Sequence, residues 1–379
     1  MESNMAGLLP NVDPDGLLEY SVVYTDRALN HMSREFQSVM TDISDSLKRV
    51  YRAHSVVLVP GGGTFGMEAV ARQFATGKHC FVVRNGWFSY RWSQIFEAGG
   101  IPSKNSVFKA KRVKDDYQEP YEPAAIDEVM KEIIAQKPDL VFATHVETAA
   151  GMMLPDEYIK KLSQAVHDVG GMLVLDCIAS GSVWVDMEAC GVDILISAPQ
   201  KGWSSSPCCG LVMLGKTARE RISQTVSTSF ACDLLKWLQI METYEKGHHA
   251  YHATMPTDGL RQLRDMMQEL EQFGFEKARE NQLELGQRVR SLLERRGIKS
   301  VAAQGYQAPG VIVNYTEDEQ MQSGKKFAEK GVQVAAGVPL QCDEPADFMT
   351  FRLGLFGIDK LKDIDGTVKR FESVVDQLL

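Results

Sequence analysis

The residues most suggestive of chemistry are Asp176 and Lys201, which stand 25 residues apart and each close an apolar run. A strand rich in Val, Ile and Leu tolerates a terminal charge only where it meets solvent, a cleft or a partner. In an open α/β sheet, the carboxyl ends of the strands form the ligand crevice. A lysine there can form a Schiff base with a carbonyl compound, and a carboxylate can keep a ring nitrogen protonated. The alternative is a structural salt bridge at the rim of the sheet.

A glycine-rich run, Gly61 to Gly66, follows the apolar segment 56–60 and precedes a helical pattern. Its backbone N–H groups and the dipole of the following helix favour a bound phosphate. The run also matches the GxGxxG pattern of dinucleotide-binding proteins. The next strand ends in Arg84 rather than in an acid, which weakens an NAD site and leaves NADP open. A glycine-rich turn without a ligand is the remaining interpretation.

Two more polar clusters close apolar runs, THVET at 144–148 and SAPQK at 197–201. Packing hydroxyls, an imidazole and a carboxylate directly after a buried strand is costly unless they meet a ligand or each other. His145 alone is not assigned a catalytic role, because a single histidine is often a satisfied core residue. If the strands are parallel neighbours, both clusters should converge with the glycine run and Asp176 in one crevice.

The elements that would position these residues alternate between strand and helix. Six runs rich in Val, Ile, Leu and Phe are predicted strands: 56–60, 81–84, 140–146, 172–178, 193–198 and 209–214. Strands alternating with helices predict an α/β fold with a mostly parallel, doubly wound sheet covered on both faces.

The pattern becomes helical after about residue 230. The stretch 257–298 predicts one long helix with an N-cap at its start, and further strands are predicted at 311–315 and 351–355. A charged helix near 316–330 and a terminal helix from about Asp359 complete a smaller α+β region.

These patterns predict three parts of the chain. They are an N-terminal arm (1–20), a large cofactor-binding domain (21–256), and a long linking helix with a small C-terminal domain (257–379). The length of 379 residues is ample for more than one domain.

Composition excludes several classes of function. A net charge of −9 argues against nucleic acid as the main ligand, because phosphate contacts need a basic surface. No apolar run approaches the roughly 20 residues that span a bilayer, and the N-terminus lacks the features of a secretory signal. The seven cysteines have no CxxC spacing, so a reducing cytoplasm is the expected compartment.

Seven motifs occur along the chain in this order: GGGTFGME (61–68), NGWF (85–88), THVET (144–148), DCIAS (176–180), SAPQK (197–201), YHAT (251–254) and FRLG (351–354). Their content and order resemble the class V pyridoxal-phosphate-dependent aminotransferases. The alanine–glyoxylate, serine–pyruvate and 2-aminoethylphosphonate–pyruvate branch is the most similar. The resemblance spans roughly residues 50–357 and implies fold type I of the pyridoxal 5'-phosphate (PLP) transferases.

The resemblance implies roles for individual residues. Lys201 would form the internal aldimine with PLP and then shuttle the proton, while Asp176 would hold the pyridine nitrogen protonated. The implied cofactor-binding residues are Gly63, Thr64, Phe88, Thr148, Asp176, Ile178, Gln200, Lys201, Tyr251 and Thr254.

Within that set, the phosphate would be bound by Gly63, Thr64 and Gln200 of the same subunit. Tyr251 and Thr254 would reach the phosphate in the neighbouring subunit, so the resemblance implies a homodimer with shared active sites.

The remaining residues of the set would surround the cofactor ring. Phe88 occupies the ring-stacking position, although Trp87 could compete for it. Thr148 would approach the ring hydroxyl, and Ile178 would pack on the opposite ring face. Arg352 would bind the substrate carboxylate bidentately.

Other interpretations of these residues stay open. Arg352 could instead pair with a structural carboxylate such as Glu344 or Asp347. The histidines near Tyr251 (248, 249 and 252) give a metal site little support, because no carboxylate or cysteine flanks them closely, and no metal is expected. Cys208 and Cys209 are more simply small hydrophobic residues than the nucleophile of a desulfurase.

Two departures from the family pattern leave the substrate open. The chain begins Gly-Leu-Leu-Pro (7–10) instead of with a Pro-Gly-Pro-like segment, and Arg27 and His31 could contact a second acidic group or the partner subunit. Trp203 and the serines after it are candidates for reshaping the substrate pocket.

The sequence therefore predicts a cytoplasmic, homodimeric PLP-dependent aminotransferase. It would move an amino group from a small amino acid or aminophosphonate to a 2-oxo acid, such as pyruvate or glyoxylate, by a ping-pong mechanism. Neither nucleic acid nor membrane is an expected partner. The alternatives are a PLP-dependent lyase that releases ammonia, an NADP-dependent oxidoreductase, and a non-catalytic protein of the same fold.

Overall fold

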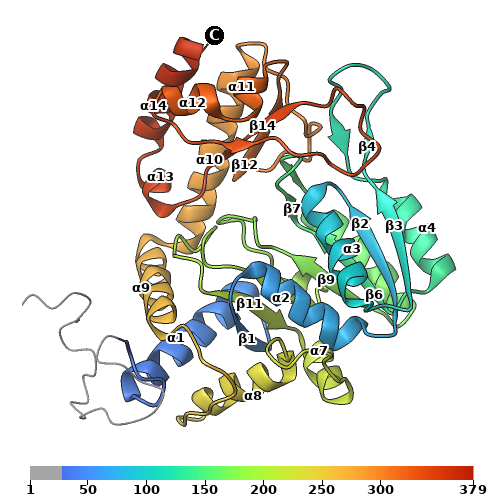
Figure 1. The fold of residues 1–379 in the computed structure, drawn as a ribbon, viewed down its shortest axis with the longest axis vertical. Helices are drawn as coiled ribbons and strands as arrows, with labels where there is room; N and C mark the ends of the chain where they lie inside the picture. Colours follow the sequence, from blue (N-terminus) through green and yellow to red (C-terminus); the bar gives the residue numbers. More distant parts are fainter. Residues whose placement is uncertain (1–27, 379) are drawn as a thin grey trace, which may run out of the picture.

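A seven-stranded sheet forms the centre of the computed structural model, which describes residues 28–378 (Figure 1). The predicted arm 1–20, the segment at 7–10 and Arg27 lie outside the described residues. The strand order is β1-β11-β10-β9-β6-β2-β3. The strands are β1 (Ser55–Pro60), β2 (His79–Arg84), β3 (Lys104–Lys109), β6 (Leu140–Thr144), β9 (Met172–Asp176), β10 (Ile194–Ser197) and β11 (Cys209–Leu214).

The sheet is mostly parallel, as predicted. Strands β10, β9, β6, β2 and β3 pair in parallel, and β11 is antiparallel to both of its neighbours. All six strands predicted in this region are present. The sequence missed β3 (KNSVFK), because an edge strand exposes one side to water and needs no apolar pattern.

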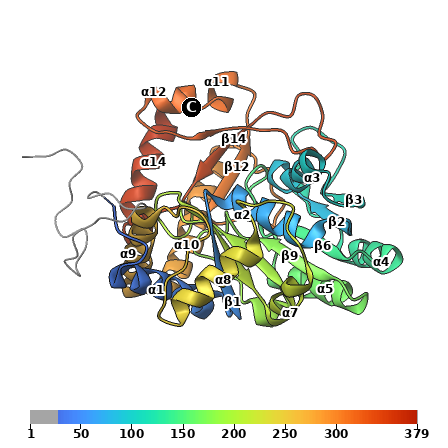
Figure 2. The same ribbon diagram turned by 60° about the horizontal axis from the view of Figure 1, so that its bottom comes forward.

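Helices cover both faces of this sheet, which confirms the doubly wound arrangement (Figure 2). Helices α2 and α3 pack on one face, and α4 and α5 lie side by side on the other. The helices of this region are α1 (Arg34–Tyr51), α2 (Gly63–Val70), α3 (Trp87–Gly99), α4 (Ile126–Gln136), α5 (Asp156–Asp168), α6 (Met187–Cys190), α7 (Lys216–Arg221) and α8 (Leu234–Glu245). Short elements between them are a π-helix (Ala71–Ala75), a 3₁₀-helix (Ile222–Gln224), β4 (Lys111–Arg112), β5 (Tyr121–Glu122), β7 (Val146–Glu147) and β8 (Met152–Met153).

The predicted single long helix is wrong. It is two helices, α9 (Thr257–Phe273) and α10 (Phe275–Glu294), separated by Gly274 with φ of 99°. A residue in that conformation ends the helical hydrogen-bond pattern, and glycine adopts it without a Cβ penalty. The predicted N-cap is also absent, because the residue before α9 is Pro256 and no side chain caps the helix.

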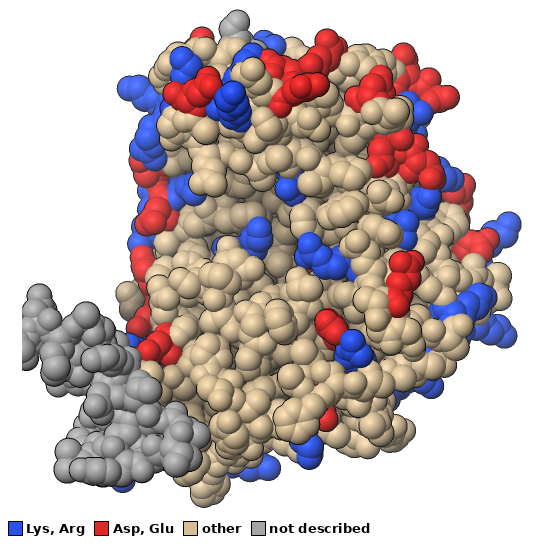
Figure 3. Space-filling model, viewed as in Figure 1, with Lys and Arg blue, Asp and Glu red and all other residues tan. Residues whose placement is uncertain are grey.

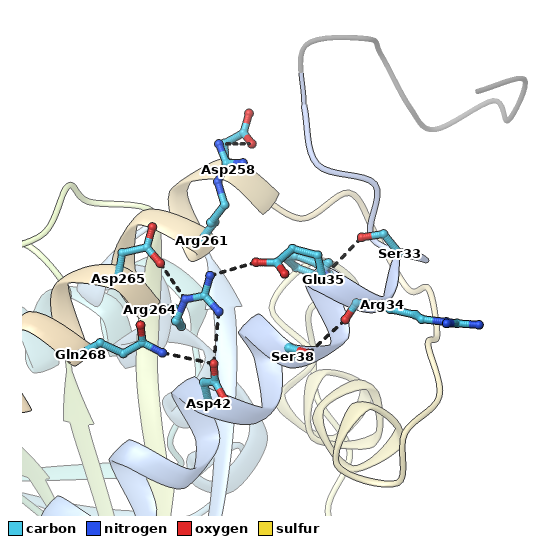
Figure 4. Close-up of polar contacts among 11 residues, drawn as sticks. Ser33, Arg34, Glu35, Ser38, Asp42, Asp258, Arg261, Arg264, Asp265 and Gln268 are labelled. Carbon is cyan, nitrogen blue, oxygen red and sulfur yellow. Dashed lines mark hydrogen bonds and ion pairs between the residues drawn. The ribbon is translucent and has the colours of Figure 1, made fainter. Parts of the chain in front are cut away.

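Helix α9 packs against α1 through a partly buried arginine (Figure 4). The guanidinium of Arg264 lies 3.0 Å from a carboxylate oxygen of Glu35 and 3.1 Å from one of Asp42, both on α1. Asp265 provides a third carboxylate at 2.6 Å. The start of the predicted linking helix is thus fixed to the first helix of the preceding region, and the domain boundary at 257 stays a prediction.

The C-terminal region is a three-stranded antiparallel sheet with helices, drawn at the top of Figure 1. Its strands are β12 (Val311–Tyr315), β13 (Ala335–Ala336) and β14 (Thr350–Gly354), which confirms the two predicted strands. The predicted helix near 316–330 is broken into α11 (Glu319–Gln322) and α12 (Lys325–Glu329) at Gly324, whose φ is 79°. Helices α13 (Ile358–Lys362) and α14 (Ile364–Leu378) pack on α10.

Candidate active site

A cavity of about 340 Å³ lies between the carboxyl ends of the central strands and strand β14. Figure 3 shows a hollow between the two regions of the molecule, with Lys and Arg side chains in it and no exposed Asp or Glu. Nine residues predicted from the sequence line the cavity: Gly63, Thr64, Phe88, Thr148, Asp176, Ile178, Gln200, Lys201 and Arg352. The four polar segments that follow separate strands therefore meet at one sheet edge, as expected.

The glycine run places the start of α2 at this cavity. Gly61 has φ of 121°, a conformation that favours glycine. A Cβ on Gly210 of β11 would lie only 2.8 Å from the Cα of Gly66, so two glycines let the helix rest directly on the strand. Gly63 and Thr64 in the first turn line the cavity, where the N-terminus of a helix favours an anion.

Asp176 ends strand β9 and is only 4% exposed. One of its carboxylate oxygens accepts a hydrogen bond of 2.8 Å from the backbone N–H of Ile178. The pKa of Asp176 is raised to about 7, chiefly by burial and also by the charge of Glu147, while the hydrogen bond from Ile178 and the charge of Arg91 oppose the shift. Among residues 28–378, Asp176 forms no ion pair with Lys201 or with any other cation, so the alternative of a structural salt bridge between the two does not hold.

The raised pKa predicts how the stability of the apoprotein depends on pH. The ordinary pKa of 3.8 applies to the unfolded chain, so folding takes up a proton at Asp176 between about pH 4 and 7. The stability from this group is complete below pH 4 and is lost as the pH rises through 7, by up to about 4 kcal/mol. Thermal unfolding of the apoprotein at pH 5 and pH 8 should therefore show a larger loss for the wild type than for Asp176→Asn. Equal losses would contradict this, and the exposed Asp45→Asn provides the control.

Lys201 lies four residues beyond the end of β10 and is partly buried in the cavity wall. Burial lowers its pKa, and the positive charges of Arg352 and Arg91 lower it further. Its Nζ lies 5.0 Å from the centre of the Phe356 ring, and no carboxylate of the described chain forms an ion pair with it. The environment thus favours the neutral amine, which is the nucleophilic form.

The turn after Lys201 is tightly packed. A Cβ on Gly202 would lie 2.0 Å from the carbonyl oxygen of Gly181. Trp203 is fully buried, with its ring 4.8 Å from that of Trp184 and 6.1 Å from that of Phe275. The idea that Trp203 reshapes the substrate pocket is therefore wrong, because its side chain points into this aromatic cluster and does not line the cavity.

A buried carboxylate that sequence reasoning missed holds the start of α3. Glu147 is fully buried and accepts hydrogen bonds from the backbone N–H groups of Phe88 (3.1 Å), Ser89 (2.9 Å) and Ala149 (3.0 Å). A Cβ on Gly86 would lie 2.7 Å from its carboxyl carbon, so glycine makes room for it. The contact fixes Phe88, which lines the cavity, whereas Trp87 does not.

Glu147→Gln should lower stability, because the amide NH₂ would face N–H groups that need an acceptor. We expect a loss of about 2 kcal/mol in the free energy of unfolding, and a higher KM through displacement of Phe88. Denaturant unfolding and steady-state kinetics would measure both. Glu97→Gln, an exposed change on the same helix, is the control. A Glu147→Gln protein as stable as this control would refute the capping role.

Arg352 lies in the middle of β14 and faces the cavity. Its Nε donates a hydrogen bond of 2.7 Å to the carbonyl oxygen of Ala336. The suggested pairing of Arg352 with Glu344 or Asp347 is wrong. Glu344 accepts backbone hydrogen bonds of its own loop, and Asp347 forms no ion pair with Arg352. Arg352 therefore has no carboxylate partner in the described chain.

Two predicted residues do not join the cavity. The hydroxyls of Tyr251 and Thr254 lie 3.3 Å apart, and Tyr251 is 54% exposed. Nearby, the ring of His252 packs on Phe230, and its Nε2 donates a hydrogen bond of 2.9 Å to the carbonyl oxygen of Phe230. No group of three potential metal ligands occurs within residues 28–378.

Two other polar residues considered from the sequence, Arg84 and His145, lie outside the cavity. Arg84 is buried and donates a hydrogen bond of 2.9 Å to Ser93. It therefore cannot contact an NADP molecule bound at the glycine run, as that alternative requires. His145 contacts Ser180 at 2.7 Å, and burial lowers its pKa to about 4.

Arg91 is the charged residue of the cavity wall that the sequence did not identify. It lies on α3, one turn after Phe88, and lines the cavity with Lys201 and Arg352. No sequence pattern marked it, because an arginine in an amphipathic helix is usually at the surface.

Comparison with known proteins agrees with this geometry. The family model described as "Aminotransferase class-V" matches residues 16–352. The chain belongs to the class V aminotransferases. The fold predicted from its motifs is therefore confirmed, and the aminotransferase assignment is favoured over the oxidoreductase alternative.

Two relatives of this class V aminotransferase have names that state an activity. The alanine–glyoxylate aminotransferase of Rattus norvegicus is 26% identical over 72% of this chain and 64% of its own length. A 2-aminoethylphosphonate–pyruvate transaminase of Phocaeicola vulgatus is 26% identical over 85% of this chain and 84% of its own. The chain thus spans just under two thirds of the rat protein.

A solved structure shares the fold of this class V aminotransferase. The alanine–glyoxylate aminotransferase of Nostoc sp. superimposes with a TM-score of 0.76, covering 91% of this chain and 88% of the other at 19% identity. At that identity, the match shows that the fold is the same.

Proposed function

We propose that this class V aminotransferase uses PLP to move an amino group from a small amino acid or aminophosphonate to a 2-oxo acid, such as pyruvate or glyoxylate, by a ping-pong mechanism. The observation that carries the proposal is the position of Asp176 and Lys201. They follow adjacent parallel strands and face one cavity without pairing with each other. A structural salt bridge would have joined them.

The residues of the cavity fit PLP. The first turn of α2 with Gly63 and Thr64, together with Gln200, would bind the phosphate. Asp176 would face the pyridine nitrogen, since its second carboxylate oxygen has no hydrogen-bond partner in the described chain. Phe88 would pack on one face of the ring and Ile178 on the opposite face. When bound, the cofactor supplies an electron sink for the substrate carbanion.

The remaining chemistry falls to residues of the chain. Lys201, whose pKa is lowered by burial and by two arginines, accepts and returns the proton at the substrate α-carbon. Arg352 binds the acidic group of the substrate and fixes its orientation. Around Arg352 the wall is apolar, with Val311, Ala335 and Leu353, which favours a small uncharged side chain.

We also propose a homodimer in which Tyr251 and Thr254 complete the partner's phosphate site. Large exposed apolar side chains lie near the phosphate site and near the segment that contains Tyr251 and Thr254. Phe65, beside Thr64, is 51% exposed, and Phe230, beside His252, is 76% exposed. Such groups are usually covered by a partner. Mixing Lys201→Ala subunits with Tyr251→Phe, Thr254→Ala subunits should restore activity that neither has alone. No recovery would argue against shared sites.

A cytoplasmic location is part of the proposal. All seven cysteines are free and buried, which suits a reducing compartment. In the described chain, no helix combines the length and apolarity that crossing a membrane would need.

The test is a spectroscopic screen. The purified protein, with PLP added, should absorb visible light, and amino donors should convert this band to that of pyridoxamine phosphate until a 2-oxo acid restores it. Absence of a visible band would overturn the proposal. Ammonia release without any need for a 2-oxo acid would identify a lyase instead.

A further inference from the structure

A second guanidinium in the cavity has no assigned role. Arg91 lies on α3 with its guanidinium carbon 5.0 Å from the centre of the Phe88 ring. Its Nη1 donates a long hydrogen bond, 3.4 Å, to the hydroxyl of Thr64 in the first turn of α2. Within residues 28–378 no carboxylate forms an ion pair with Arg91. A partly buried arginine whose polar contact is a single long hydrogen bond to a hydroxyl is available for an anion.

The charges of the cavity wall point to what that anion is. The wall carries two guanidinium groups, those of Arg91 and Arg352, besides the amine of Lys201, and Asp176 is its single carboxylate. A phosphate monoester carries about −1.5 to −2 charges at pH 7. Two guanidinium groups can therefore serve two anions, the phosphate of the cofactor and the acidic group of the substrate.

The two arginines come from different regions of the chain, although their guanidinium carbons lie 5.0 Å (Arg91) and 5.4 Å (Arg352) from the centre of the same Phe88 ring. Arg352 is hydrogen-bonded to Ala336 in the C-terminal sheet, whereas Arg91 contacts Thr64 at the helix start that faces the cavity from the large sheet. The hydrogen-bond partner of Arg91 is therefore a residue proposed to bind phosphate.

We propose that Arg91 is a cofactor-binding residue that forms a charge-assisted hydrogen bond with the phosphate of PLP, next to Thr64. This inference rests on the proposed function, because it presumes that PLP occupies the cavity. It places a full positive charge at a phosphate site otherwise made of backbone N–H groups, hydroxyls and an amide. The contact with Phe88 holds the guanidinium in place.

The experiment compares two ligands that differ only in the phosphate. Dissociation constants of PLP and of pyridoxal are measured with the apoprotein of the wild type, Arg91→Gln and Arg91→Lys. Arg91→Gln should weaken PLP about 10- to 100-fold and leave pyridoxal unchanged. Arg91→Lys should fall between, because lysine keeps the charge but not the planar donors. Inorganic phosphate should raise the melting temperature of the wild-type apoprotein more than that of Arg91→Gln.

Controls separate the possible failures. Arg49→Gln, at an exposed arginine of α1, should change neither constant. Equal weakening of PLP and pyridoxal by Arg91→Gln, or no weakening of either, would overturn the inference. So would an unchanged PLP constant with a raised KM for acidic amino donors only, which would make Arg91 a substrate residue. If wild-type protein binds no PLP, the proposed function itself fails.

Discussion

Replacing Lys201 by alanine should reduce transamination by at least about 10⁴-fold, because the chain then loses its covalent link to the cofactor and its proton carrier at once. The visible band that PLP gives with the wild type should be absent. The fold should survive, since the side chain forms no ion pair or hydrogen bond in the described chain. Single-turnover assays and visible spectra of the purified variant would measure both effects.

The control for this change is Lys216→Ala, an exposed lysine at the start of α7. It should leave rate and spectrum unchanged. An added primary amine should restore a small part of the activity of Lys201→Ala, because a free amine can replace the missing proton carrier. Activity of Lys201→Ala within tenfold of the wild type would show that another residue performs the chemistry.

Asp176→Asn should lower kcat by about 10² to 10⁴-fold while PLP still binds. A carboxylate buried to 4% exposure strongly favours a protonated nitrogen opposite it, and an amide of the same shape cannot supply that charge. The variant therefore separates electrostatics from packing. The measurement is kcat for the best donor and acceptor pair from the spectroscopic screen.

Binding of PLP by the same variant, followed by its visible absorbance, is the internal control. Asp45→Asn on the surface of α1 should behave as the wild type. A kcat for Asp176→Asn within threefold of the wild type would mean that Asp176 does not face the ring nitrogen.

The sheet and much of the cavity wall could be predicted because they depend on local sequence. Buried parallel strands must be continuous apolar runs, so polar residues at their carboxyl ends stand out. That rule identified Asp176, Lys201 and the glycine run. It failed for β3, whose edge position removes the need for an apolar pattern.

Residues whose role depends on distant partners could not be predicted. Glu147 was within a recognised motif, yet its role in holding α3 depends on N–H groups about 60 residues earlier. Arg91 is in an ordinary helical segment, and its contact with Thr64, 27 residues earlier, appears only in the folded chain. Trp203 was expected at the substrate, and its burial depends on Trp184 and Phe275.

The sequence by itself determined the order in which apolar strands and polar clusters follow one another along the chain. It also contains the motifs that mark a class V aminotransferase. Only the tertiary structure decided that Asp176 and Lys201 face one cavity without pairing, and that Arg352 has no structural carboxylate. The physical reason is that the residue types alone decide which polar and charged groups need a partner when they are buried. Which partner each one meets depends on contacts between segments far apart in the chain.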